Sequence, residues 1–233
     1  MDGTILRSLS WLWAVLLFIA INVVLQPGPL NWRSPRRFVA TLIGLTRLVA
    51  DDRMRQNHAL EHATINVLED RFGRGRVAFI GLARRDGFYL RGPATPALIE
   101  EAAWEALSRL SAGEGRLALR PQCGTSVFAA NLLLSVTVLI ALLGLGRRSP
   151  LEVFLWLGAA NLAGPRFGRA VQERLTTALP GPDLTVRRVT GRPVMAGFFG
   201  RAAAIVPMDF FVETGPGTGG TEATGPKGGE GKP

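Results

Sequence analysis

The sequence is poor in cysteine, histidine, lysine and charge. Its 233 residues include one cysteine, two histidines and only 19% charged residues, with a mean hydropathy of +0.21. The single cysteine, Cys123, excludes an intramolecular disulfide and leaves a thiol that is inert, reactive or a metal ligand. An ordinary soluble domain has about a quarter charged residues, so the low charge argues against a purely soluble globule.

The basic charge is almost all arginine. The formal net charge is +9, and the two lysines, Lys227 and Lys232, lie at the very end of the chain. Such charge can bind nucleic acid or anionic lipid, but the arginines are spread along the chain without the interleaved aromatic residues of a nucleic-acid module. In an apolar chain, arginines at the ends of membrane helices are the first explanation. We therefore expect the lipid bilayer as a partner and no nucleic acid.

Two stretches, residues 9–26 and 127–145, are apolar and free of charge. About 20 apolar residues cross a bilayer as a helix, so both qualify as membrane spans. The alternatives are a pair of buried core helices or, for the first stretch, a cleaved signal peptide. The first stretch has no good small-residue cleavage site, which favours an uncleaved transmembrane helix within residues 1–28.

Two shorter apolar stretches flank these spans. Residues 151–163 follow the second span and predict a short return helix, so that residues 126–165 would form a membrane hairpin. Within residues 29–50, an apolar run is interrupted by Arg47 and predicts a linker or an interfacial helix. The sequence therefore predicts two or three transmembrane helices.

Arginines near the helix ends predict the orientation. Arg33, Arg36 and Arg37 follow the first span, whereas only Arg7 precedes it. The arginines of the hairpin turn, at 147–148, indicate the opposite orientation. Most of the flanking arginines place the domain between the two spans in the cytoplasm, in a multi-pass protein of the bacterial inner membrane.

Residues 51–125 are predicted to form a small α+β domain. The expected order is a helix, a β-hairpin, a second helix and a further strand, at residues 51–71, 76–91, 95–110 and 116–120. Residues 166–213 are expected to add a helix and strands, and the Gly-rich residues 214–233 a disordered tail. The overall fold class is then an α+β membrane protein with a cytoplasmic domain.

Both histidines lie in the run His58-Ala59-Leu60-Glu61-His62. On a helix, positions i and i+4 stack one turn apart, so His58 and His62 can chelate one metal ion. Glu61 shares that face, in the H-x-x-E-H arrangement of inverted zinc peptidases, whose glutamate is a general base. The alternative is a solvated helix face, or a hydrogen-bonded pair, that happens to contain two histidines.

A zinc site needs a third ligand. Cys123 is the leading candidate, because thiolate and imidazole together suit zinc; its alternative role is that of a small buried residue. Glu69 is a poor candidate, because two further turns place it about 10 Å along the helix axis.

The two motifs together resemble a known family. The segments His58-x-x-Glu61-His62-x-Thr64-Ile65 and Pro121-x-Cys123-Gly124-Thr125-Ser126, the second followed by an apolar helix, look like those of the YqhQ-like family of bacterial membrane proteins. The run 57–64 is closer still to a related uncharacterised group, and Gln172 with Thr176-Thr177 is a weaker similarity. The sequence departs from the YqhQ-like pattern at Ala63, where a lysine is usual, and in the second helix of the hairpin.

This resemblance implies a predicted metal-dependent enzyme in which His58, His62 and Cys123 belong together, with Glu61 beside them. The first functional hypothesis is a zinc-dependent hydrolase in which Glu61 takes a proton from water. The alternative is a non-enzymatic protein with a structural or redox-sensitive metal site. An open fourth coordination position would favour the enzyme, and a fourth protein ligand the structural role. The residues do not identify a substrate.

Overall fold

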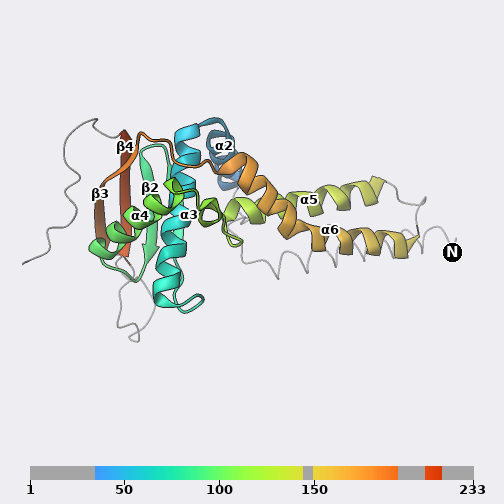
Figure 1. Ribbon diagram of the computed structural model, residues 1–233. Coiled ribbons are helices and arrows are strands. Elements are labelled where there is room, and N and C mark those ends of the chain that lie inside the picture. The colour runs from blue at the N-terminus through green and yellow to red at the C-terminus, as the bar shows by residue number, and fades with distance from the viewer. Residues whose placement is uncertain (1–34, 144–148, 194–207, 217–233) are drawn as a thin grey trace, which may run out of the picture.

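The computed structural model describes residues 35–143, 149–193 and 208–216 (Figure 1). A π-helical turn, η2, and a short 3-10 helix, η1, accompany the regular helices and strands. In chain order the elements are α2 (Pro35–Ala50), α3 (Asp52–Phe72), β1 (Ile80–Arg84), β2 (Gly87–Gly92), α4 (Pro96–Ser111), η1 (Gly115–Ala118), α5 (Gly124–Leu143), α6 (Pro150–Val171), η2 (Gln172–Thr176), β3 (Leu184–Pro193) and β4 (Met208–Pro216).

The four strands form one antiparallel sheet in the order β1-β2-β4-β3. Helices α3 and α4 lie together on one side of the sheet (Figure 1). Apolar side chains from α3, α4 and the inner face of the sheet make the core, with Leu60, Ile99, Phe88 and Phe210 fully buried. Helix α3 packs against both α4 and the sheet. The polar residues in the middle of α3 are therefore buried together with its apolar ones.

Local signals explain the two core helices. Asp51 caps α3 by accepting hydrogen bonds from the backbone N–H groups of Arg53 and Met54. The helix ends at Gly73, whose φ of 87° suits glycine. At the start of α4, Thr95 accepts from the N–H of Leu98. These boundaries, and the hairpin turn between β1 and β2, confirm the elements predicted from the sequence for residues 51–110.

Three other elements differ from the prediction. The expected strand at 116–120 is replaced by η1, whose four residues form a 3-10 helix. α6 continues through Pro165 to Val171, so the expected short return helix and the helix after it are one element. β4 extends to Pro216, which takes the first residues of the expected disordered tail into the sheet. Residues 217–233 lie outside the described residues.

The α+β character predicted from the sequence is confirmed, but the prediction of a multi-pass membrane protein is wrong. Across the described ranges, no helix combines the length and the apolar character that crossing a membrane requires. α6 has 22 residues, but they include three charged side chains and Pro165, whereas a span needs about 20 predominantly apolar residues. The predicted location in the bacterial inner membrane is wrong for the same reason. The stretch at residues 9–26 lies outside the described residues, as do residues 144–145 at the end of the second predicted span.

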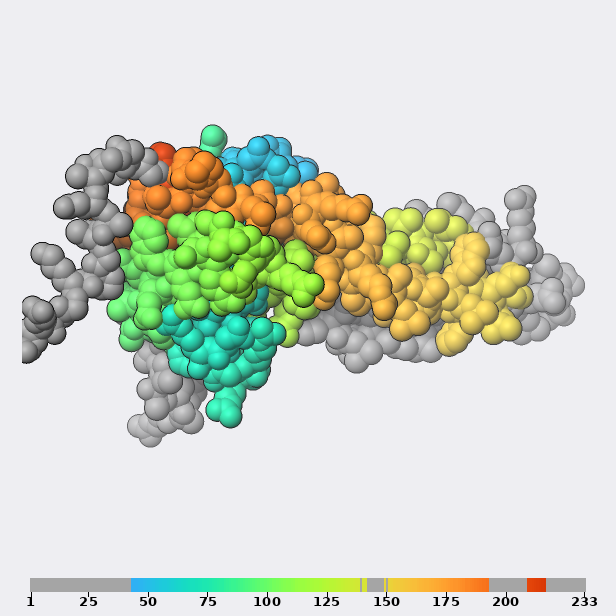
Figure 2. Space-filling model, in the orientation of Figure 1, coloured from blue at the N-terminus to red at the C-terminus, as the bar shows by residue number. Residues whose placement is uncertain are grey.

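Helices α5 and α6 pack against each other and extend away from the sheet (Figures 1 and 2). The contact is close at their base, where Ser126 donates a hydrogen bond to the backbone oxygen of Gly168. A side chain at Gly168 would collide with the backbone of Ser126, so glycine permits this approach. Two residues next to these helix ends, Cys123 before α5 and Gln172 after α6, contact the histidines of α3.

Candidate metal centre

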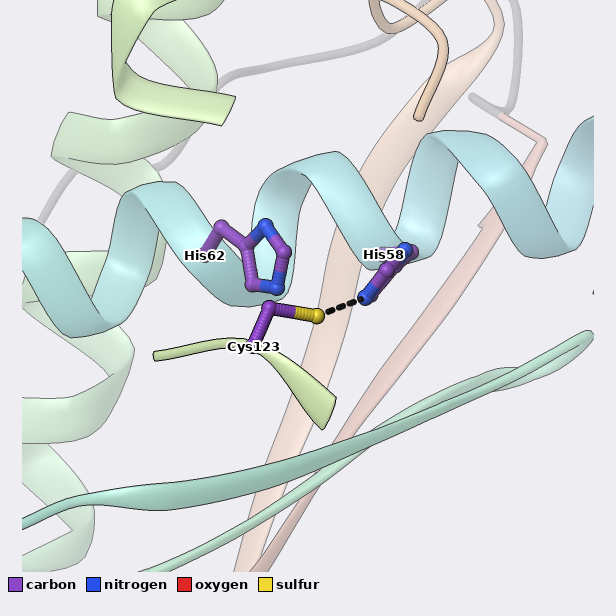
Figure 3. Close-up of side chains that lie close together, drawn as sticks. All are labelled: His58, His62 and Cys123. Carbon is purple, nitrogen blue, oxygen red and sulfur yellow. Dashed lines mark hydrogen bonds between the residues drawn. The ribbon is translucent and has the colours of Figure 1, made fainter. Parts of the chain in front are cut away.

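The histidine side chains of α3 and the sulfur of Cys123 converge on one point (Figure 3). His58 and His62 are buried one turn apart, with ring centroids 4.2 Å from each other. Cys123 immediately precedes α5, and its Sγ lies 3.4 Å from Nε2 of His58. One ligand atom from each of the three residues lies within 4.8 Å of the other two. The three residues are therefore close enough to bind one metal ion.

A backbone carbonyl contacts Nδ1 of each imidazole ring. Nδ1 of His58 lies 2.8 Å from the carbonyl oxygen of Thr176, and Nδ1 of His62 lies 2.8 Å from that of Ala118. When each Nδ1–H donates to its carbonyl, each Nε2 keeps a lone pair. Metal-binding histidines are usually held by such a hydrogen bond from the other ring nitrogen.

The separation of the sulfur and the His58 nitrogen suits a small tetrahedral ion. Zinc binds sulfur at about 2.3 Å and histidine nitrogen at about 2.0–2.1 Å, which places tetrahedral sulfur and nitrogen ligands about 3.5 Å apart. The observed separation of Cys123 Sγ and His58 Nε2 is 3.4 Å. In the part of the chain that the structure describes, the group has three members, and no aspartate, glutamate or further histidine or cysteine joins them. The two imidazoles and the thiol therefore form a nitrogen and sulfur donor set of three residues.

The pKa values of Cys123 and His58 favour a thiolate and an imidazolium, an ion pair across their hydrogen bond. Burial opposes ionisation of the Cys123 thiol, but hydrogen bonds from His58 and His62 outweigh it and lower its pKa to about 4. Burial also opposes the imidazolium of His58, yet its hydrogen bond to Cys123 and the negative charges of Glu61 and Cys123 raise its pKa to about 9. The hydroxyl of Thr125, 3.0 Å from the sulfur, can donate to the thiolate.

Glu61 is buried beside this group but does not belong to it. Its carboxylate packs against the backbone of β1 at Gly81, where any β-carbon would collide with it. Burial raises the pKa of Glu61, while the positive charges of His62, His58 and Arg120 oppose that shift. The carboxylate is thus close enough to interact with both histidines.

Glu69, which the helix geometry made a poor ligand, is occupied elsewhere. It forms an ion pair with Arg120, and both side chains are largely buried. Arg120 also donates a hydrogen bond from Nη1 to the carbonyl oxygen of Phe79. This pair connects α3 with the segment that leads to Cys123.

Sequence reasoning gave no role to the groups that surround the histidines. The carbonyl acceptors belong to Ala118 and Thr176, and a backbone carbonyl has no residue signature. Gln172 is 1% exposed and contacts Nδ1 of His62 through its amide nitrogen at 3.1 Å. From the sequence, Gln172 was known only as part of the family resemblance, which did not predict a contact with His62.

Residues 53–189 match a domain of unknown function, DUF6391. The chain belongs to the DUF6391 family. The match includes every residue of the candidate metal centre. An uncharacterised protein of Picosynechococcus sp. (strain ATCC 27264 / PCC 7002 / PR-6) is 33% identical to this DUF6391 protein over 138 residues, which are 54% of this chain and 67% of that protein. No solved structure matches the chain.

The ion pair predicts how zinc binding to this DUF6391 protein depends on pH. At pH 7 Cys123 is already a thiolate, whereas His58, with its pKa of about 9, is protonated. Zinc binds the neutral imidazole, so we expect each ion to displace about one proton at pH 7 and its affinity to rise roughly tenfold per pH unit towards pH 9. Calorimetry in buffers of different ionisation enthalpy measures the released protons. Binding without proton release at pH 7 would contradict the ion pair.

Proposed function

We propose that this protein binds one zinc ion through Nε2 of His58, Nε2 of His62 and Sγ of Cys123, and that the centre is hydrolytic with Glu61 as the general base. The observation that carries the proposal is the convergence of three ligand atoms within 4.8 Å of one another. Two of the ligands lie on one helix, and the third is separated from them by more than fifty residues of folded chain.

The donor chemistry supports zinc over harder ions. Imidazole and thiolate are borderline and soft ligands that suit zinc, whereas magnesium and calcium prefer oxygen ligands. The similarity of both motifs to the YqhQ-like family, whose members are predicted metal-dependent enzymes, points the same way. The zinc assignment therefore rests on the donor set together with the two motifs.

The chain supplies the parts that hydrolysis at such a centre needs. Zinc in this position would act as a Lewis acid and lower the pKa of water by many units, to about 7. Glu61 lies beside both histidines, and its carboxylate can accept a proton from that water and return it to a leaving group. Burial raises the pKa of Glu61, and a carboxylate with a raised pKa accepts a proton more readily. Arg120 lies close enough to Glu61 to stabilise the ionised carboxylate.

A second candidate function is a structural or redox-sensitive metal site. The half-buried Cys123 favours it, because a low-pKa thiolate is open to oxidation, which would release the ion. In this role Glu61 would orient a histidine rather than take a proton. The two functions therefore differ in what the Glu61 carboxylate does.

Metal analysis of the purified protein tests the shared part of both functions. We expect about one zinc ion per chain after purification without chelators, and one site that refills after chelation and dialysis. A panel of ester and peptide substrates, assayed with zinc-loaded and chelated protein, then tests hydrolysis. A chain that neither retains nor regains zinc would contradict both functions, whereas zinc binding without any hydrolysis would favour the structural site.

A further inference from the structure

The buried amide of Gln172 lies between His62 and the backbone of Arg120, which leads to Cys123. Its Oε1 accepts a hydrogen bond from the backbone N–H of Arg120 at 3.0 Å, and its Nε2 lies 3.1 Å from Nδ1 of His62. Because Arg120 N–H requires an acceptor, the oxygen must face Arg120 and the nitrogen must face His62. The orientation of the amide is thereby fixed by the backbone.

The contact to Arg120 also reaches the sulfur ligand. The backbone N–H of Cys123 donates to the carbonyl oxygen of Arg120 at 3.2 Å, closing a turn from Arg120 to Cys123. Gln172 holds the first residue of that turn, and the turn ends at the sulfur ligand. A change at position 172 should therefore move both Cys123 and His62.

His62 has two partners for one ring nitrogen. When Nδ1 carries the proton, the carbonyl of Ala118 accepts it, and Nε2 is free to bind a metal. When Nδ1 is bare, the amide of Gln172 can donate to it. Only the Ala118 carbonyl supports the tautomer that binds a metal through Nε2, and the Gln172 amide supports the other tautomer. In the metal-bound centre Gln172 therefore acts through its bond to Arg120 N–H.

The π-helical turn η2 contains both Gln172 and the Thr176 carbonyl that contacts His58. The carbonyl oxygen of Gln172 accepts from the backbone N–H of Thr177 at 3.0 Å and from its hydroxyl at 2.9 Å. The carbonyl of Thr176, one turn later, is the acceptor for His58. Single π-helical turns are rare and frequently lie at functional sites. Here the turn brings one polar contact to each histidine.

We propose that Gln172 is a positioning residue of the metal centre, which holds the turn of Cys123 in the geometry for zinc. The proposal rests on the zinc site proposed above. Gln172 is not one of the three ligands, so its effect on zinc affinity passes through Arg120 to Cys123. The expected size is that of other contacts that orient metal ligands, about 10–100-fold in metal affinity.

Two substitutions of Gln172 separate positioning from packing. Gln172→Leu keeps most of the volume and removes both polar contacts, whereas Gln172→Glu keeps an acceptor for Arg120 N–H and can accept from Nδ1–H of His62. We expect the leucine variant to bind zinc roughly 10–100-fold more weakly, and its cobalt form to have a weaker thiolate-to-cobalt absorption band. The glutamate variant should retain most of the affinity. Glu173→Gln, on the exposed neighbouring residue, is the matched control.

The melting temperature of the metal-free variants completes the test. We expect it to fall by a few degrees in Gln172→Leu, where the buried N–H of Arg120 loses its acceptor, and to stay near the wild-type value in Gln172→Glu. Wild-type affinity in Gln172→Leu would overturn the proposal. So would metal-free forms of both variants that fail to fold, since Gln172 would then serve stability alone. If the wild-type chain itself binds no zinc, the proposed zinc site fails instead, and the two failures are distinguishable.

Discussion

Replacing Cys123 with alanine should weaken zinc affinity more than about 100-fold. That is the upper limit of the effect of losing a contact that only orients a metal ligand. The sulfur is one of three ligand atoms, and two histidines on one helix do not complete a zinc site. Zinc at 100 times its dissociation constant adds about 2.7 kcal/mol to the free energy of unfolding. In a chain of this size that gain should raise the melting temperature of the wild type by roughly 5–10 °C. The variant should show no such rise.

Thr125→Val is the matched control in the same segment. It removes a hydroxyl 3.0 Å from the sulfur but leaves all three ligands, so we expect zinc affinity to fall by at most about 100-fold. Competition with a coloured chelator measures both variants. Tight binding that survives Cys123→Ala would show that the ion, if there is one, is held elsewhere.

The sequence predicted the parts of the fold that local chemistry determines. Gly73 ends α3, and Thr95 and Pro96 begin α4. The hairpin turn is Arg85-Asp86, one residue before the Asp86-Gly87 pair that the sequence indicated. Each signal acts within a few residues, through a side-chain cap or a backbone conformation. The same holds for His58 and His62, because helical spacing alone places them one turn apart.

The surroundings of the histidines could not be predicted, because they come from distant segments. The acceptor for His62 is a carbonyl in η1, where the short run 116–120 favoured a strand. The acceptor for His58 lies in η2, which follows a helix that continues through Pro165. Proline usually ends a helix, so sequence reasoning divided α6 in two and lost the link between the helix and the site.

The membrane assignment failed because hydropathy counts do not report packing or continuity. Apolar side chains are indeed exposed on α5 and α6, including Leu132, Phe154 and Leu162. However, α6 also contains Glu152 and two arginines, and a hydrogen bond from Ser126 to Gly168 joins the two helices at their base. An apolar composition therefore indicated the two helices but not their role.

Glu61→Gln should retain zinc and lose hydrolytic activity by about 10²–10⁴-fold, the usual contribution of a general acid or base. The amide keeps the size and the hydrogen-bonding capacity of the side chain but cannot take a proton from water. All three ligand atoms remain, so metal content should stay at the wild-type level. The measurements are metal analysis and hydrolysis by the zinc-loaded variant. Glu100→Gln, the same change at an exposed position of α4, is the control.

Gly81→Ala tests the same carboxylate from outside. A β-carbon at position 81 would collide with the Glu61 carboxylate, which must then move, whereas no ligand is touched. We expect zinc content to be kept and activity to fall, because the base must lie within hydrogen-bond reach of the water. Loss of zinc in Glu61→Gln would instead assign the carboxylate to orienting a histidine. Full zinc occupancy with undiminished activity in Glu61→Gln would exclude Glu61 as the base.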